Sequence, residues 1–272
     1  MNDLGLQIAT VLPWFAVEPQ AEYTRVVVPA EYAATWDDIL DDAVRRCYIS
    51  DEQLAERAHA ANVPRAQIVA ALLPDPGSVM SGDFGEIVAY IYLASREAAT
   101  AVIGPKRWRL KQDRTKSVPY SDVVQLILPQ WPLTSDHDRI VCAEVKAKAT
   151  AGNFAPITAA IEGSQRDRTS RLSRTLVWLR ERSLLQDIGT VTIPQLNRFI
   201  NATDHTPHVR QYHAIVVICS NLVEAELATL VPATIPEGCA LAVISVPHLQ
   251  NTYTTVFEAV HQSVAAAPQA LP

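Results

Sequence analysis

The spacing of apolar residues changes several times along the chain, from the 3.6-residue period of a helix to the alternation or short apolar runs of a strand. In the first 78 residues it predicts a strand over 24–30 and helices over 35–50, 51–62 and 63–73. Asp51 is the expected cap of the second helix. The segment LPDPGSVMSG, residues 73–82, has the proline, glycine and serine content of a connector.

After this connector, GDFGEIVAYIYLASREAA has apolar residues at helical spacing and predicts a helix over residues 82–99. Residues 155–185 predict one long helix or two. Five segments are expected to be strands: 102–112, 121–129, 139–149, 212–220 and 239–247. This order of elements predicts an α/β domain with a mixed central sheet over residues 79–272, preceded by an α+β segment over residues 1–78 that serves docking or regulation.

The composition is that of a folded protein, with 49% hydrophobic and 19% charged residues in 272. No apolar run reaches the roughly 18 residues that a transmembrane helix needs. We therefore expect a cytoplasmic protein with no membrane partner.

Charge is distributed unevenly along the chain. The formal net charge is −6, yet all five lysines lie between positions 106 and 148, and residues 165–182 carry six arginines. A basic lining in an acidic protein suggests that one face meets a polyanion such as nucleic acid. Two helix faces exposed to solvent would give the same pattern.

Three charged residues are expected to meet at one end of the sheet. Glu144 and Lys146 share a face of the strand over 139–149, because residues two apart in a strand point the same way. Asp122 stands at the start of the preceding strand, and converges with them if the two strands are neighbours. Two such carboxylates suit Mg²⁺ (or Mn²⁺), and the lysine could orient or deprotonate the attacking water. A salt bridge between Glu144 and Lys146 on an edge strand is the alternative.

The arrangement resembles the PD-(D/E)xK nuclease superfamily, in which an acid is followed, on the next strand, by acid-x-lysine. The resemblance implies a restriction-endonuclease-like fold and a Mg²⁺-dependent deoxyribonuclease. By this resemblance Asp122, Glu144 and Glu86 would bind the metal, and Lys146 would act beside them in catalysis. Asp136 or Asp138 could replace Asp122, because the gap before Glu144 is long.

Glu86 has a second explanation, since Asp83 and Glu86 have the spacing of a helix capping box. The two roles are compatible with each other. Gly82 and Gly85 favour a functional site, because glycine is costly in a helix unless something approaches the backbone closely.

Within the superfamily, several motifs together resemble the nuclease subunit of the Hachiman antiphage defence system. They are GDFGE, SDVVQLIL, AEVK and AIEGSQRDRTSRLSRTLVWL, within residues 80–220. The resemblance implies DNA as the substrate and a helicase subunit of the same defence system as the partner. A catalytically inactive nuclease-fold subunit that binds nucleic acid or a partner protein is the alternative. Six residues are expected to contact nucleic acid: Lys148, Gln165, Arg168, Arg171, Arg107 and Lys111. The alternative for the arginines among them is that they are solvated or paired with Asp167 and Glu162.

Overall fold

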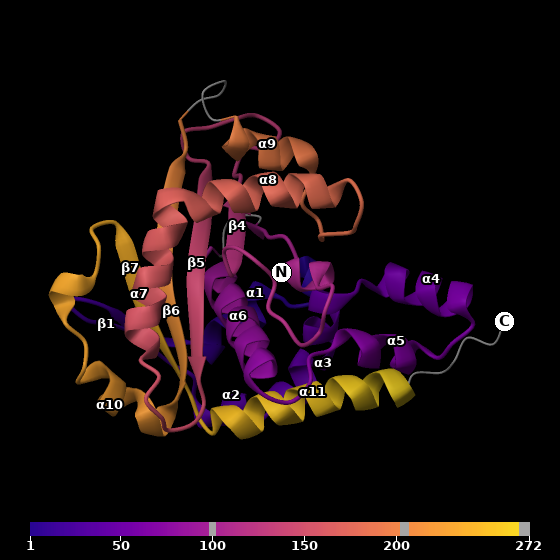
Figure 1. Cartoon of the computed structure of the whole chain (residues 1–272), viewed down its shortest axis with the longest axis horizontal. Coiled ribbons are helices and arrows are strands. Elements are labelled where there is room, and N and C mark those ends of the chain that lie inside the picture. The colour runs from indigo at the N-terminus through magenta and orange to yellow at the C-terminus, as the bar shows by residue number, and fades with distance from the viewer. Residues whose placement is uncertain (98–101, 202–206, 267–272) are drawn as a thin grey trace.

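The computed structural model describes residues 1–97, 102–201 and 207–266, and its centre is a seven-stranded mixed sheet (Figure 1). The strands follow the spatial order β1-β2-β7-β6-β5-β4-β3. Their bounds are β1 (Ala16–Pro19), β2 (Thr24–Val27), β3 (Val102–Ile103), β4 (Val123–Ile127), β5 (Arg139–Lys148), β6 (Val209–Cys219) and β7 (Cys239–Val246). The predicted α/β class with a mixed sheet is confirmed.

Pairing along the sheet is parallel in the middle and antiparallel at both ends. Strands β5, β6, β7 and β2 run parallel to one another, whereas β4 pairs antiparallel with β5 and β3 with β4. At the other end, β1 pairs antiparallel with β2. The first 78 residues therefore contribute two strands to the same sheet as the rest of the chain.

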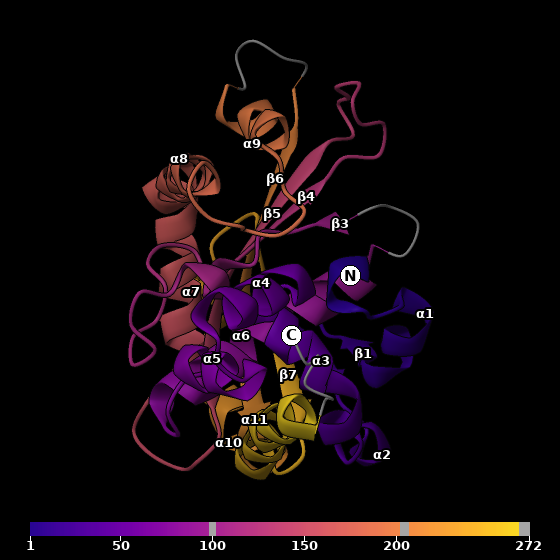
Figure 2. The ribbon, with the colours of Figure 1, turned by 90° about the vertical axis from the view of Figure 1, so that its right-hand side faces the viewer.

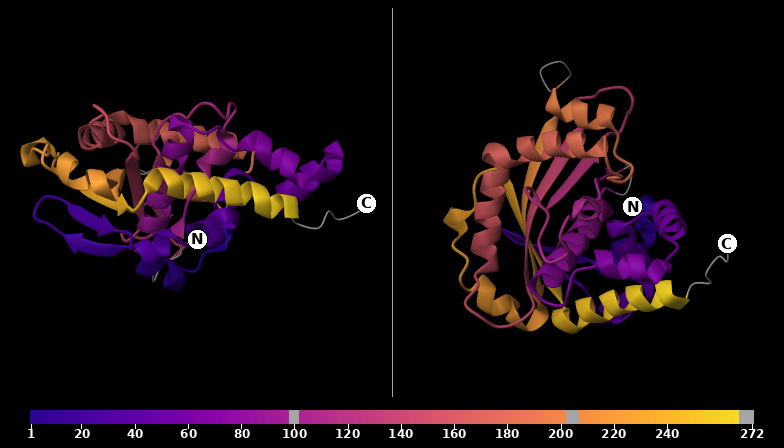
Figure 3. Two further views of the ribbon diagram at one scale, coloured as in Figure 1. Left: turned by 90° about the horizontal axis from the view of Figure 1, so that it is seen from below. Right: turned by 45° about the vertical axis from the view of Figure 1, so that its right-hand side comes forward.

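Helices cover both faces of this sheet. The α-helices described are α1 (Ile8–Val11), α2 (Ala30–Ala33), α3 (Trp36–Tyr48), α4 (Asp51–Ala61), α5 (Arg65–Leu72), α6 (Ser78–Ser95), α7 (Pro156–Arg166), α8 (Leu172–Ser183), α9 (Ile193–Ile200), α10 (Val223–Leu227) and α11 (Leu249–Ala266). In Figure 2 the helices of the first 78 residues lie on the side of the sheet that carries α6 and share its core, and α11 packs along α3 and α5 (Figure 3). Within the described ranges, no helix is long and apolar enough to cross a membrane.

The central strands are apolar because both of their faces are covered, as parallel strands usually are. Val145 and Val217 face the core that α6 shares with α3 and α11. Cys142 faces the opposite side, in the core beneath α8 and α9, and Val216 lies in the core beneath α7. Consecutive residues of β5 therefore alternate between two helical layers, and this alternation fixes which side Glu144 takes.

Three local predictions are wrong. The cap of α4 is Ser50, whose hydroxyl accepts a hydrogen bond from the backbone N–H of Gln53, and not Asp51. Helix α6 begins at Ser78, so residues 78–82 are helical and not part of a connector. The expected strand over 102–112 is limited to Val102–Ile103, and Arg107–Leu110 form a 3₁₀ helix.

Candidate active site

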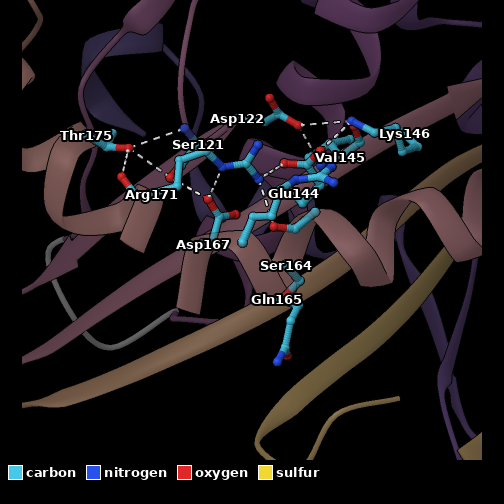
Figure 4. Close-up of polar contacts among 12 residues, drawn as sticks. Ser121, Asp122, Glu144, Val145, Lys146, Ser164, Gln165, Asp167, Arg171 and Thr175 are labelled. Carbon is cyan, nitrogen blue, oxygen red and sulfur yellow. Dashed lines mark hydrogen bonds and ion pairs between the residues drawn. The ribbon is translucent and has the colours of Figure 1, made fainter. Parts of the chain in front are cut away.

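The register between β4 and β5 brings Asp122, Glu144 and Lys146 together (Figure 4). Val123 pairs with Ala143, so Asp122 lies just before the ladder, beside the part of β5 that carries Glu144. A carboxylate oxygen of Asp122 accepts a hydrogen bond from the Val145 N–H at 2.9 Å. The Lys146 Nζ lies 2.5 Å from Glu144 Oε1 and 3.7 Å from Asp122 Oδ2. Both acids thus face one ammonium group at the start of β4.

The alternative expectation is a salt bridge between Glu144 and Lys146 on an edge strand. The two side chains do form an ion pair. The expectation of an edge strand is wrong, because β5 is an inner strand between β4 and β6. Glu144 is only 2% exposed. Its second carboxylate oxygen accepts a hydrogen bond from the Arg171 guanidinium. A buried acid between two cations is held in one orientation by charge-assisted hydrogen bonds.

Helix α7 leaves space for this carboxylate at Gly163. A Cβ atom at position 163 would overlap the carboxyl group of Glu144. The carbonyl oxygen of Gly163 also accepts a hydrogen bond from Arg171 at 2.8 Å. Glycine at this position is therefore explained by the close approach of an acidic side chain to the helix backbone.

Arg171 belongs to a π-helical turn, Asp167–Arg171, that joins α7 to α8. The two helices run in clearly different directions, and the π-helical turn accounts for the bend (Figure 1). The Nε of Arg171 donates to Asp167 Oδ1 at 2.6 Å, and the Ser121 hydroxyl donates to the same oxygen at 2.7 Å. Ser121 directly precedes Asp122, so the network reaches both acid-bearing strands.

Glu86 approaches from α6, on the other side of the sheet. The helix packs closely on β5 at Gly85, where an added Cβ would lie 3.1 Å from the Cβ of Ala147, whereas Gly82 has open space around it. The close approach expected for the two glycines is therefore confirmed at Gly85 and wrong at Gly82. The Glu86 side chain is buried in this packing, with 8% of the residue exposed.

The capping-box explanation of Glu86 is wrong, because Asp83 and Glu86 both lie inside α6 and not at its first turn. The buried Asp83 carboxylate instead accepts hydrogen bonds from the Tyr48 hydroxyl at 2.6 Å and from the Lys111 ammonium at 2.5 Å. These contacts join α6 to α3 and to the segment after the 3₁₀ helix.

Electrostatics in this region disfavours several negative charges at once. Burial, and then the charge of Glu144, raise the pKa of Asp122 to about 6. Burial, followed by the charge of Asp122, raises the pKa of Glu86 well above its usual range. Burial alone would lower the pKa of Lys146, but the charges of Asp122 and Glu144 outweigh it and raise this pKa. Lys146 is consequently an ammonium ion at neutral pH.

Repelling carboxylates of this kind fit a divalent cation, which would relieve the cost of ionising them. Asp122, Glu144 and Glu86 offer the oxygen ligands that Mg²⁺ prefers. Among the residues described, however, no three acidic, histidine or cysteine side chains are gathered closely enough to hold a metal ion. Binding by all three acids would therefore require at least one of them to shift.

The two other aspartates considered in place of Asp122 lie elsewhere. Asp136 is exposed, and Asp138 is buried in an ion pair with Arg198, at 2.7 Å. Asp138 immediately precedes β5, at the opposite end of the strand from Lys148. Asp122 is the aspartate that contacts Lys146.

Most of the residues expected to contact nucleic acid are turned inward. Lys111 pairs with Asp83, Arg171 with Glu144 and Asp167, and Lys148 with Glu226. Arg107 is buried and donates to the carbonyl oxygens of Val118 and Pro119. Gln165 is exposed but points away from the Glu144–Lys146 pair (Figure 4), and Arg168 is exposed on the π-helical turn.

Sequence reasoning missed Ser121 and Gly163 as parts of the site. It expected Arg171 to contact phosphate, with pairing to Asp167 as an alternative, and the pairing with Asp167 is confirmed. One signal was available for Asp167: it follows Ile157, Ile161 and Ser164 at helical spacing, on the buried face. A buried acid on that face needs a cationic partner. Nothing in the spacing tells which strand residue Arg171 meets.

Comparison with known proteins places the chain in a family. No curated protein matches it. The family model of HamA matches residues 23–260, which include most of the N-terminal segment and both acid-bearing strands. The chain therefore belongs to the HamA family and is a HamA-like subunit of the Hachiman antiphage defence system.

Proposed function

We propose that this protein is a Mg²⁺-dependent deoxyribonuclease that hydrolyses DNA phosphodiester bonds in antiphage defence. The observation that carries the proposal is the position of one ammonium group, Lys146, beside the two carboxylates of Asp122 and Glu144. An acid on one strand and an acid-x-lysine on its neighbour are the arrangement that the PD-(D/E)xK resemblance implies. Membership of the HamA family supports the context of phage defence.

Asp122 and Glu144 would hold the metal, and Glu86 would join them from α6 if at least one of the three side chains shifted. Bound there, Mg²⁺ (or Mn²⁺) would act as a Lewis acid on the phosphate and offset its negative charge. The raised pKa values of Asp122 and Glu86 support this assignment, since both side chains ionise more easily with a cation beside them.

Lys146 has the role of a hydrogen-bond donor. Its raised pKa keeps the side chain protonated, so it holds a proton at Nζ and does not remove one from water in this state. The side chain is 28% exposed, which leaves the ammonium accessible to a ligand from solvent. It would bind a non-bridging phosphate oxygen and stabilise the charge that develops there during cleavage.

A partner that delivers DNA fits the charge of the chain. The net charge of −6 disfavours spontaneous association with duplex DNA, and several of the expected basic contacts are paired internally. We propose a helicase subunit of the same system as this partner. Arg168 is exposed and would serve as a phosphate contact, although one of its terminal nitrogens donates to the Glu237 carbonyl oxygen.

The second candidate function is a catalytically inactive subunit that binds nucleic acid or a partner protein. One observation favours it: both oxygens of Glu144 are engaged by Lys146 and Arg171. A carboxylate used only as a structural anion would look the same.

Degradation of plasmid and linear DNA, with and without Mg²⁺ or Mn²⁺, separates the two functions. We expect metal-dependent cleavage that falls at least about 100-fold in Lys146→Ala. Lys116→Ala is the matched control, because Lys116 is 78% exposed and outside the site. Equal cleavage by both variants would exclude the site. Absence of both cleavage and metal binding, even with the helicase subunit present, would favour the inactive subunit.

A further inference from the structure

A buried polar network connects the two acid-bearing strands to the π-helical turn. Arg171 is its centre: one edge of the guanidinium contacts Asp167 and another nitrogen contacts Glu144 (Figure 4). Asp167 also accepts from the Ser121 hydroxyl. Thr175 completes the network, since its hydroxyl lies 2.9 Å from that of Ser121 and donates to the Arg171 carbonyl at 2.8 Å.

The burial of Asp167 indicates that its charge matters. The residue is 1% exposed, and its Oδ2 atom has no hydrogen-bond partner among the residues described. An acid so placed is costly unless its charge is balanced by a cation close by. Arg171 is the cation that contacts it.

The balance of charge around Glu144 depends on this pairing. Lys146 and Arg171 bring two positive charges to Glu144, which by themselves would oppose the binding of a further cation. Asp167 supplies the negative charge that offsets Arg171. Removing the charge of Asp167 would leave the positive charge of Arg171 directed at Glu144 alone.

We propose that Asp167 and Arg171 are positioning residues for the metal site: Arg171 fixes the Glu144 carboxylate, and Asp167 holds Arg171 and balances its charge. The inference rests on the proposed nuclease function. It gives Arg171 a different role from the phosphate contact expected from the sequence. The Nε of Arg171 donates to Asp167, and one terminal nitrogen donates to Glu144 and to the Gly163 carbonyl. Groups of the protein itself therefore set the orientation of the guanidinium, and no phosphate is needed to hold it.

Asp167→Asn is the most informative variant, because asparagine preserves the shape of the side chain but removes its charge. Arg171 is then held less firmly and its positive charge is no longer balanced, and both effects weaken cation binding. We expect the apparent Kd for Mn²⁺, measured by calorimetry without DNA, to rise at least about tenfold, which corresponds to one 1.4 kcal/mol step. Asp113→Asn is the matched control, since it makes the same charge change at an exposed loop. Thermal melting without metal establishes that each variant is folded.

Arg171→Lys provides a second, independent test. It keeps the charge, but one ammonium group cannot reproduce the two separate guanidinium contacts to Asp167 and Glu144. We expect slower cleavage of linear DNA and weaker Mn²⁺ binding, with unchanged affinity for DNA in Ca²⁺. A fall in DNA affinity with unchanged Mn²⁺ binding would instead establish the phosphate contact and overturn the inference.

The outcomes separate this inference from the proposed function. If the wild type binds Mn²⁺ and cleaves DNA, and Asp167→Asn matches Asp113→Asn in Mn²⁺ affinity, the positioning role is excluded and the nuclease function stands. If the wild type neither binds Mn²⁺ nor cleaves DNA with its partner present, both fall together.

Discussion

Gly163 of α7 and Glu144 of β5 are in such close contact that the carboxyl group occupies the space where any other residue at position 163 would place its Cβ atom. The contact fixes the separation between α7 and the sheet at the candidate metal site. Gly163 has no side chain of its own, yet it determines where the Glu144 carboxylate can lie.

Gly163→Ala should displace Glu144 or push α7 away from the sheet. We expect DNA cleavage to fall at least tenfold, and the free energy of unfolding to fall by about 1–3 kcal/mol, the usual cost of overpacking. Cleavage assays and urea denaturation measure the two effects. Gly82→Ala is the control, because its surroundings are open and alanine favours a helix by up to about 1 kcal/mol. Equal stability changes in the two variants would contradict the contact.

Asp122→Asn should make the protein more stable at neutral pH in the absence of metal. The pKa of Asp122 in the folded state is about 6, above the ordinary value of 3.8, so folding is favoured while the group is protonated. Its contribution is fully present below about pH 4 and is lost as the pH rises through about 6. Asparagine removes this loss, and we expect the variant to be more stable by roughly 1–3 kcal/mol at pH 7.5.

Urea denaturation at pH 4 and pH 7.5 tests the sign. The advantage of Asp122→Asn over the wild type should be clear at pH 7.5 and nearly absent at pH 4. An equal difference at both pH values would show that the effect comes from packing and not from ionisation.

Mg²⁺ should stabilise the folded protein, because it offsets the repulsion among the acids of the candidate site, Asp122, Glu144 and Glu86. A cation that binds only the folded protein adds about 1.4 kcal/mol to the free energy of unfolding at ten times its Kd. We expect the melting temperature of the wild type to rise with Mg²⁺ at pH 7.5, and that of Glu144→Gln to stay constant. A similar rise in both proteins would place the bound cation away from Glu144.

Asp138→Ala should lower the free energy of unfolding far more than a substitution of Asp122 does. The Asp138–Arg198 pair is buried on both sides, so losing the acid leaves a buried guanidinium without its counter-charge. Breaking such a pair costs about 3–5 kcal/mol. Asp136→Ala is the control: Asp136 is 72% exposed, and we expect a change within about 0.5 kcal/mol by urea denaturation.

Lys148 and Arg168 should behave differently, although the sequence predicts nucleic-acid contacts for both. Lys148 is buried against Glu226 and two loop carbonyls, so Lys148→Ala should lower stability by about 1–3 kcal/mol. Arg168→Ala should leave stability nearly unchanged and weaken DNA binding. DNA binding measured at several salt concentrations tests this. One lost phosphate contact lowers the magnitude of the slope of log K against log salt concentration by about one. A Lys148 variant that loses DNA affinity without losing stability would contradict this assignment.

The sequence by itself determined the α/β class and the pairing of two acids with one lysine. Alternation places Glu144 and Lys146 on the same face of a strand, and Asp122 directly precedes β4, so antiparallel pairing of β4 with β5 was enough to bring them together. Apolar β-branched runs of strand length identified β4, β5, β6 and β7 for the same local reason. These features depend on neighbours along the chain.

Only the tertiary structure decided which cations meet which acids. Arg171 reaches Glu144 across 27 positions of sequence, and Lys111 reaches Asp83 across 28. The sequence predicts that the basic segments form a surface for nucleic acid. Several of their side chains are instead paired in the interior, because buried acids on α6, β5 and the π-helical turn require counter-charges. Long-range pairing of charge leaves no periodic trace in the sequence, so the fold alone assigns it.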